Sequence, residues 1–382
     1  MRIALVQQHA EADKPANVAR GLRALETAAR NGARLVCFAE LAFERFYPQR
    51  PADANPRRLA EPVPGPTTEA FQARARELGV VVVLNLYERD GDRAYDCSPV
   101  IDADGRLLGR TRMIHITDYA CFHEQWYYTP GDTGAPVYDT RAGRVGLAIC
   151  YDRHYPEYMR ALALKGAELV VVPQAGAVGE WPEGLYEAEM RVAAFQNGYF
   201  AALCNRVGAE ECLTFAGESF VCAPDGSVIA RAPQGEDAIL YADVDLGAVA
   251  ASHARRLFLQ HRRPELYAAW ISQSTPRRSQ QRTRNGHGSE RVRTADKATA
   301  PGGVQAPSPS FGRLRMASAT LDEAQRAESG GPGRSSKERS LGVPACRPGC
   351  AERRGELGPH ERRAWRGAGA FAKLRAPSHG FG

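Results

Sequence analysis

Residues 1–271 are predicted to form a layered domain of mixed α/β (α+β) class. Short apolar runs rich in β-branched residues alternate with stretches whose apolar residues recur at helical spacing, and this alternation is typical of sheets covered by helices. Turn sequences at 102–105 (DADG) and 224–226 (PDG) each separate two apolar runs and predict hairpins, so the sheets are not purely parallel. The 43% hydrophobic and 25% charged residues fit a globular protein.

The pattern places the individual elements in order along the chain. Apolar runs predict strands at residues 2–7, 33–38, 80–86, 95–101, 107–111, 145–150, 169–173, 199–205, 220–222, 228–230 and 238–244. Helical spacing predicts helices at residues 17–31, 67–78, 157–165 and 185–197. The second of these helices follows the breakers Pro64, Gly65 and Pro66, which favour a helix start.

Residues 272–382 differ from the rest of the chain in composition. They carry 21 Lys and Arg against 9 Asp and Glu, whereas residues 1–271 carry 29 against 35. This segment has little apolar periodicity and cannot bury enough apolar surface to offset the entropy of ordering, so we predict a disordered basic tail. A basic tail can bind nucleic acid, but aromatic residues are not interleaved for base stacking. A solvated extension or the product of a shifted reading frame is therefore favoured, and no nucleic acid partner is expected.

Several classes of protein are excluded by what the sequence lacks. No run of 18 or more apolar residues occurs, so a membrane-spanning helix is not expected. The apolar stretch at residues 3–6 is too short for a signal-peptide core, and we expect a cytoplasmic protein. The nine cysteines are scattered without a CxxC pair, so neither a disulfide framework nor a zinc site is expected.

Glu40 is the first candidate for chemistry. It ends the apolar run at 33–38 in the sequence FAEL, where an unpaired carboxylate is costly to bury. A carboxylate at the carboxyl end of a strand often lines a crevice in α/β proteins. The alternative is a structural ion pair with a nearby arginine such as Arg45, and the residue alone does not decide between the two.

Cys150 is the second candidate, in the sequence AICYDRHYPE. It lies where a strand turns towards a helix, a geometry that can lift a side chain out of the sheet as a nucleophile. The alternative is a small buried apolar residue, which most strand cysteines are. The polar and aromatic run that follows favours the functional interpretation.

The third candidate is the aromatic segment at 122–132, which contains Glu124 and Trp126. Aromatic side chains in an irregular segment can form the wall of a small-molecule pocket. The alternative is ordinary loop packing.

Taken together, these segments resemble the nitrilase (carbon–nitrogen hydrolase) superfamily over about residues 1–271. The markers occur in the family's order: FAEL (38–41), GRTRMIHITD (109–118), EQWYYTPGD (124–132), GLAICYDRHYPE (146–157), KGAELVVVPQA (165–175), YEAEMRVAAFQNGYFAALCNRVG (186–208), FAGESFVCAPDG (215–226) and HRRPELY (261–267). The chain is most similar to the N-carbamoyl amino acid and N-carbamoyl amine amidohydrolases, including β-ureidopropionase.

The resemblance implies a four-layer αββα sandwich that assembles into a homodimer or larger homo-oligomer. It implies that Glu40 is the general base, Cys150 the nucleophile and Glu124 the second glutamate of the site. The implied reaction is hydrolysis of a linear amide or ureido bond through a cysteine thioester, with no metal or other cofactor. The backbone N–H of Tyr151 is the implied donor to the oxyanion.

The sequence departs from the family at one catalytic position. The family's lysine lies in a segment Arg-Lys-x-His, and here the segment reads RMIH, with Met113 at the lysine's place. Loss of one oxyanion donor typically costs about 2.7–4 kcal/mol of transition-state stabilisation. Arg110, Arg112 or His115 are candidates to supply a cation instead, and Met113 can alternatively shape a pocket for a different substrate.

Three further residues are predicted to bind substrate. Arg153 suits a substrate carboxylate because its guanidinium can pair bidentately, although pairing with Asp152 or Glu157 explains it equally well. His154 lines the pocket or holds a loop, and Trp126 belongs to the aromatic wall. The sequence therefore predicts a carbon–nitrogen hydrolase acting on an N-carbamoyl amino acid or amine. The alternative is a catalytically impaired, ligand-binding or regulatory relative, for which Met113 is the argument.

Overall fold

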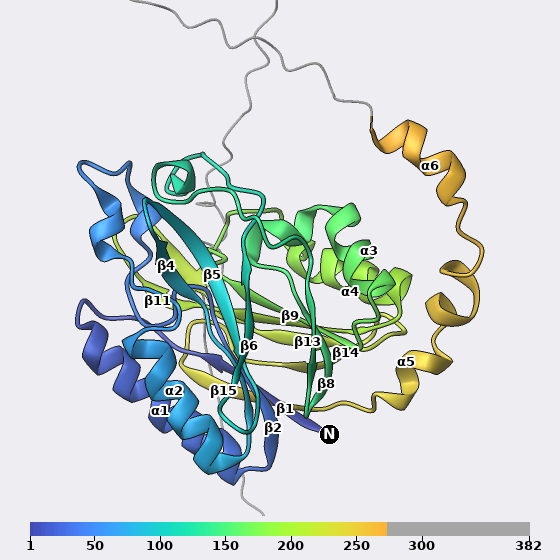
Figure 1. Cartoon of the computed structure of the whole chain (residues 1–382), viewed down its shortest axis with the longest axis horizontal. Helices are drawn as coiled ribbons and strands as arrows, with labels where there is room; N and C mark the ends of the chain where they lie inside the picture. The colour runs from blue at the N-terminus through green and yellow to red at the C-terminus, as the bar shows by residue number, and fades with distance from the viewer. Residues whose placement is uncertain (273–382) are drawn as a thin grey trace, which may run out of the picture. The chain divides into compact units, whose positions relative to one another are not determined.

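The structure, a computed structural model, describes residues 1–272, and in these residues two β-sheets lie face to face between two pairs of helices (Figure 1). The first sheet has the order β15-β1-β2-β3-β5-β4, with β6 paired to β5. Its strands are β1 (Arg2–Gln7), β2 (Ala33–Phe38), β3 (Val81–Val83), β4 (Leu86–Asp90), β5 (Arg93–Ile101), β6 (Leu107–Arg112) and β15 (Ala238–Asp243).

The second sheet has the order β14-β13-β10-β9-β8-β7. Its strands are β7 (Val137–Thr140), β8 (Gly143–Leu147), β9 (Leu169–Gln174), β10 (Phe200–Asn205), β13 (Phe220–Cys222) and β14 (Val228–Arg231). A separate pair is formed by β11 (Val207–Ala209) and β12 (Thr214–Ala216). In each large sheet the central strands are parallel and the edge strands antiparallel, as the predicted hairpins require.

Three apolar cores hold the layers together. Side chains of β1, β2 and β3 meet those of β8, β9 and β10 between the sheets, as with Leu5 and Val171. Helices α1 (Lys14–Arg30) and α2 (Pro66–Leu78) cover the outer face of the first sheet, and α3 (Pro156–Leu164) and α4 (Leu185–Asn197) cover the second. The four-layer αββα sandwich implied by the resemblance is therefore confirmed.

The helix boundaries follow from local sequence signals. The side chain of Asp13 accepts a hydrogen bond from the backbone N–H of Ala16 at 3.3 Å and caps the start of α1, with Pro15 in the first turn. Helix α2 ends at Gly79, whose φ of 66° lies in the left-handed region that favours glycine.

The predicted strand at 80–86 is interrupted in the structure. β3 and β4 pair with successive parts of β5, and the break falls at Leu84 and Asn85. Pro99 of β5 lies opposite Leu84 and has no N–H to donate, so this pair keeps only the hydrogen bond from the Leu84 N–H to the Pro99 carbonyl oxygen, at 3.2 Å. The break turns the side chain of Asn85 into the protein, where it is fully buried.

The C-terminal part of the described chain contains short helices that the sequence pattern did not predict. They are α5 (Gly247–Ala251), the π-helical turn η5 (Ala254–Phe258) and α6 (Pro264–Ile271), which contains no buried residue and extends from the sandwich (Figure 1). The predicted tail lies outside the described residues except for Ser272. None of the helices in residues 1–272 is long and apolar enough to cross a membrane.

A disulfide framework was not expected from the sequence, but the structure contains a disulfide that the scattered cysteines did not predict. Cys121 and Cys212, which are 91 residues apart in the sequence, form a disulfide. The pair joins the loop that carries Glu124 to the turn between β11 and β12, a proximity that the spacing of the cysteines does not reveal. Cys37, Cys204 and Cys222 are buried in strands.

Candidate active site

Glu40, Glu124 and Cys150 meet in one buried cluster. One carboxylate oxygen of each glutamate and the Sγ atom of Cys150 all lie within 4.8 Å of one another. Glu40 follows β2 of the first sheet, Cys150 follows β8 of the second, and Glu124 begins the short helix η3 (Glu124–Trp126). The two sheets therefore each supply one reactive side chain, and a loop supplies the third.

The backbone is strained at both strand ends. Cys150, which opens the 3₁₀ helix η4 (Cys150–His154), has a φ of 41°, and Leu41, directly after Glu40, has a φ of 44°. A non-glycine residue in this region costs roughly 1–3 kcal/mol and persists only where the surroundings enforce it. Such strain is typical of functional sites, and here it presents the thiol and the carboxylate from sharp turns.

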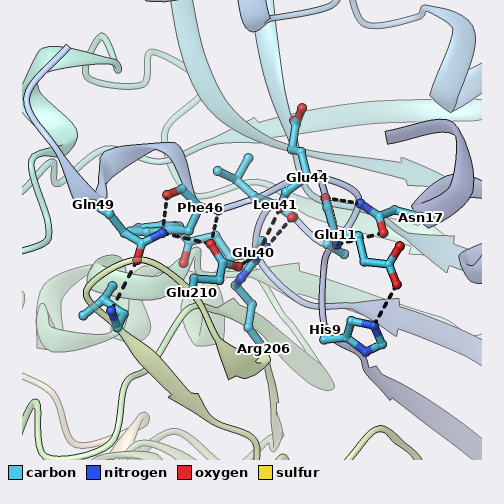
Figure 2. Close-up of polar contacts among 12 residues, drawn as sticks. His9, Glu11, Asn17, Glu40, Leu41, Glu44, Phe46, Gln49, Arg206 and Glu210 are labelled. Atoms are coloured by element: carbon cyan, nitrogen blue, oxygen red, sulfur yellow. Dashed lines mark hydrogen bonds and ion pairs between the residues drawn. The ribbon is translucent and has the colours of Figure 1, made fainter. Parts of the chain in front are cut away.

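Arg206 anchors the turn that carries Glu40 (Figure 2). Its guanidinium donates to the carbonyl oxygens of Glu40 at 2.9 Å and of Glu44 at 3.0 Å, and also to that of Leu41. The carboxylate of Glu210 accepts from the same guanidinium and balances its charge. Arg206 therefore fixes the backbone of the turn rather than the Glu40 carboxylate itself.

The environment of Glu40 suits a general base. Burial raises the pKa of Glu40 to about 7, with a further contribution from the charge of Glu124. An ordinary glutamate is fully ionised near pH 7 and a weak base, whereas a pKa near the working pH favours proton transfer. Burial also raises the pKa of Glu124 well above its usual range, although the N–H of Thr117 donates to its Oε2 at 3.1 Å.

The Cys150 thiol is protonated at rest. Burial, together with the charges of Glu40 and Glu124, raises its pKa well above the usual range. A thiolate therefore forms only if a neighbouring group removes the proton as the sulfur attacks. Glu40 is the group placed to do so.

Met113 lies at the family's lysine position and is completely buried. It packs with Ile149 and Cys150 in a small apolar cluster at the base of the site. Its backbone is fixed by two hydrogen bonds, from its N–H to the Asp96 carbonyl at 2.9 Å and from the Gly131 N–H to its own carbonyl at 2.7 Å.

The candidate replacement cations are all engaged elsewhere. Arg112 pairs with Glu88, Asp90 and Asp132, and Arg110 also pairs with Glu88. The ring of His115 hydrogen-bonds to Asp152 at 2.7 Å. The lysines of the described part of the chain are Lys14, which pairs with Glu44 and Glu61, and Lys165, at the end of α3. The suggestion that Arg110, Arg112 or His115 supplies the missing cation is therefore wrong for this structure.

Asp96 is a third carboxylic acid at the site, and it was not among the residues predicted from the sequence. It lies on β5, is 1% exposed and neighbours Glu40. Burial and the charge of Glu40 raise the pKa of Asp96 well above its usual range. A regular hairpin around the turn at 102–105 would place residue 96 opposite residue 111, whereas the ladder is offset, with a register shift between Val100 and Ile101, and this offset brings Asp96 beside Met113.

The predicted substrate-binding residues lie in different surroundings. Arg153 is buried and donates to the Cys150 carbonyl at 2.9 Å and to Gln174 at 2.8 Å, and it pairs with Glu189. The Nδ1 atom of His154 also hydrogen-bonds to Glu189, at 2.6 Å. Both side chains therefore hold the loop after Cys150. The acid that pairs with Arg153 is Glu189, not Asp152 or Glu157 as predicted.

The other two predicted site residues are Trp126 and Tyr151. Trp126 is 53% exposed on η3 and is not part of the buried cluster. The backbone N–H of Tyr151 donates no hydrogen bond to another group in residues 1–272, which leaves it free to bind an oxyanion.

An aromatic wall that the sequence analysis missed lies beside the site. Tyr119 and Tyr186 both donate hydrogen bonds to the carboxylate of Glu180, and the ring of Trp181 lies 6.2 Å from that of Tyr119 and 5.3 Å from that of His154. A cavity of about 480 Å³ is lined by Trp181 and Tyr186 among other residues, but its lining does not include Glu40, Glu124 or Cys150. Long-range folding assembles this wall from separate loops, so no local motif marks it.

Comparisons with known proteins show the family of the chain. The chain matches the family described as carbon-nitrogen hydrolase over residues 2–254. It is 34% identical over 284 residues to an N-carbamoylputrescine amidase from Solanum lycopersicum, which covers 71% of this chain and 94% of that protein. It is 30% identical over 279 residues to a citrullinase from Francisella tularensis subsp. tularensis, which covers 70% of this chain and 96% of that protein.

Solved structures give the same result. A carbon-nitrogen hydrolase from Helicobacter pylori G27 has a TM-score of 0.67 and 29% identity, and covers 72% of this chain and 100% of that chain. A mutant amidase from Nesterenkonia sp. AN1, with acrylamide added at its active-site cysteine, has a TM-score of 0.60 and 27% identity, and covers 71% of this chain and 99% of that chain. The chain therefore belongs to the carbon–nitrogen hydrolase family.

Proposed function

We propose that this carbon–nitrogen hydrolase cleaves an N-carbamoyl compound through a thioester on Cys150. The observation that carries the proposal is the buried contact between Cys150 and Glu40, a carboxylate whose pKa is raised to about 7. A thiol that needs a base and a base tuned to neutral pH lie side by side. Glu124 completes the cluster and orients the substrate nitrogen.

The steps follow from this geometry. Glu40 takes the thiol proton as Sγ attacks the ureido carbonyl carbon, and the oxyanion binds the N–H of Tyr151. The carbon–nitrogen bond then breaks, and Glu40 returns the proton to the departing ammonia. Glu40 next takes a proton from water, whose oxygen attacks the thioester carbon. The carbon–sulfur bond breaks, the thiol is restored, and the carbamate product decomposes to an amine and carbon dioxide.

The charges around the site favour a substrate that carries an amine at the end remote from its carbamoyl group. Arg153, the predicted carboxylate ligand, already holds Glu189 and Gln174. Glu180 presents a carboxylate at the aromatic wall instead. A protonated amine is attracted to that carboxylate, whereas a substrate carboxylate is repelled. The match to an N-carbamoylputrescine amidase supports the same choice.

Ammonia release tests the proposal. Purified enzyme is supplied with N-carbamoylputrescine, N-carbamoyl-β-alanine, citrulline and butyramide in turn. We expect the first compound to be the best substrate. Cys150→Ala should abolish turnover, and Glu40→Gln should lower it about 10²–10⁴-fold. Cys222→Ala, at a buried cysteine of β13 outside the site, is the matched control and should retain activity. Equal ammonia release by wild type and Cys150→Ala across the panel would refute the proposal.

A second candidate function rests on Met113. In this alternative the protein, which lacks the lysine, is a non-catalytic relative that binds ureido compounds without hydrolysing them. It predicts that iodoacetamide modifies Cys150 no faster at neutral pH than an ordinary exposed thiol, whereas an active site predicts faster modification. Turnover of any of the four compounds would count against this alternative.

We also propose that the enzyme is a cytoplasmic homodimer. Val192 and Phe195 of α4 are 51% and 38% exposed on the outer helical layer, and Leu164 at the end of α3 is 50% exposed. Exposed apolar side chains grouped on one layer are typical of a subunit interface. Light scattering should give twice the monomer mass, and a Val192→Ser/Phe195→Ser double variant should shift the mass towards the monomer. An unchanged monomeric mass for the wild type would refute the dimer.

A further inference from the structure

Asp96 occupies the place beside Met113 at the base of the site. β5 and β6 are antiparallel, with Cys97 opposite Arg112, and the next pair along the ladder brings Asp96 beside Met113. The Met113 N–H donates to the Asp96 carbonyl at 2.9 Å. Neighbours on adjacent strands present their side chains to the same face of a sheet. An acid therefore adjoins the position from which a lysine is missing.

Asn85 couples Asp96 to the Glu40 turn. Its Nδ2 donates to Asp96 Oδ1 at 2.5 Å, and its Oδ1 accepts from the Leu41 N–H at 2.7 Å. The side chains of Asn85 and Asp96 are both buried, and Asn85 holds Asp96 on one side and the Leu41 backbone on the other. The same Nδ2 also donates to Ser98 Oγ at 3.1 Å, and the other oxygen of Asp96 is buried without a hydrogen-bond partner.

The two carboxyl groups lack donors if both are ionised. In the described part of the chain, Asp96 Oδ2 and both carboxylate oxygens of Glu40 are buried without a hydrogen-bond partner. Two adjacent buried carboxylates repel each other strongly, and one proton between them removes the repulsion and supplies the missing donor. The acidic and phenolic groups that face this pair are Glu124, Cys150, Asp152 and Tyr128.

We propose that Asp96 keeps a proton and donates it in a hydrogen bond to Glu40, and thereby replaces the lysine as the donor that holds the general base ionised. This inference rests on the proposed role of Glu40 as base. The Asp96 proton stays on Asp96 throughout the reaction, while Glu40 shuttles the proton that comes from the thiol. Asp96 is thus a positioning residue for Glu40.

The pH dependence of Cys150 alkylation tests the inference without any substrate. The rate of Cys150 modification by iodoacetamide is measured by mass spectrometry between pH 5 and 9 in wild type, Asp96→Asn and Asp96→Ala. The rate rises as Glu40 loses its proton, so the pH at which the rise is half complete, the midpoint, reports the ionisation of Glu40. The asparagine amide is neutral and can donate to Glu40 as the acid does. We therefore expect its midpoint to stay within about half a pH unit of wild type. Alanine removes the donor and should raise the midpoint by about one unit or more.

An ionised Asp96 predicts the opposite result. Both substitutions would then remove a negative charge beside Glu40, and both midpoints would fall. That outcome, or an unchanged midpoint in Asp96→Ala, overturns the inference. Asp96→Val, which also lacks a side-chain donor, serves in place of the alanine variant if the latter does not fold. Asp102→Asn, at a buried aspartate just beyond the end of β5, is the control for general effects. If alkylation follows the expected pattern while no compound releases ammonia, the proposed function fails and this inference stands.

Discussion

Met113 lies in the same buried apolar cluster as Cys150, the proposed nucleophile, and Ile149 is the third buried member of that cluster. A thioether thus lies where the resemblance places an ammonium. Glu40 and Glu124 lie beside Cys150, and the two lysines of residues 1–272 lie elsewhere, Lys14 paired with Glu44 and Glu61 and Lys165 at the end of α3. The site therefore differs from its family's pattern in charge while it keeps the base, the second glutamate and the thiol in contact.

Substitution Met113→Lys should increase turnover. The new ammonium would lie beside Cys150 and near Glu40 and Asp96, where it can stabilise the oxyanion as well as the ionised base. One such donor is typically worth about 10²–10³ in kcat. Ammonia release with N-carbamoylputrescine measures the effect, and Met113→Leu, of similar volume, should change kcat little. A Met113→Lys enzyme no faster than wild type would show that this site does not use a cation.

Glu40→Gln should stabilise the protein at alkaline pH. The folded-state pKa of Glu40 is raised from 4.5 to about 7, so the unfolded state loses this proton first and stability falls as pH rises between those values. The raised pKa of Glu40 lowers the free energy of unfolding by about 3 kcal/mol above pH 7 and has no effect below pH 4.5. Urea unfolding of wild type and variant at pH 5 and pH 8 measures it. A gain that is equal at both pH values would contradict the assignment.

The sequence is sufficient to predict the layers and the catalytic cluster. Strand and helix periods are local, so β1, β2 and α4 agree with their predicted ranges. Glu40 and Cys150 stood out because a polar or reactive residue at the end of an apolar strand is costly without a purpose. Their meeting in one cluster was implied by the resemblance to the family, because the two residues follow strands of different sheets.

The features that were missed depend on pairing across the fold. The break between β3 and β4 arises because Pro99 lies opposite Leu84, which only the register reveals. Asp96 belongs to the site because it lies beside Glu40, a residue more than fifty positions earlier in the chain. The Cys121–Cys212 disulfide likewise joins two loops whose proximity no spacing rule encodes.

Arg206→Met should destabilise the protein and slow the enzyme. The substitution removes the donors to the carbonyl oxygens of the Glu40 turn and leaves Glu210 buried without its partner. Breaking a buried pair from one side costs about 3–5 kcal/mol. Urea unfolding measures the loss, and Arg191→Met, at an exposed pair with Glu187, should cost under about 0.5 kcal/mol. Equal losses in the two variants would mean that Arg206 does not anchor the turn.

Glu180→Gln should change the preference for substrate charge. The carboxylate accepts hydrogen bonds from Tyr119, Tyr186 and the Ala177 N–H, and the amide keeps an acceptor oxygen but loses the charge. We expect kcat/KM for N-carbamoylputrescine to fall about tenfold, a loss of about 1.4 kcal/mol, while neutral butyramide is unaffected. A similar fall for both compounds would indicate a structural role for Glu180 alone.

The Cys121–Cys212 disulfide should stabilise the loop that carries Glu124. A crosslink of this span typically contributes about 2–4 kcal/mol, chiefly by restricting the unfolded chain. Cys121→Ser, Cys212→Ser and the double variant should therefore lose the same amount in urea unfolding, because each removes one shared bond. A reducing agent should bring wild type close to the variants, and in a reducing cytoplasm the thiol form would prevail. Additive losses in the single variants would show that the cysteines stabilise the fold separately rather than as a pair.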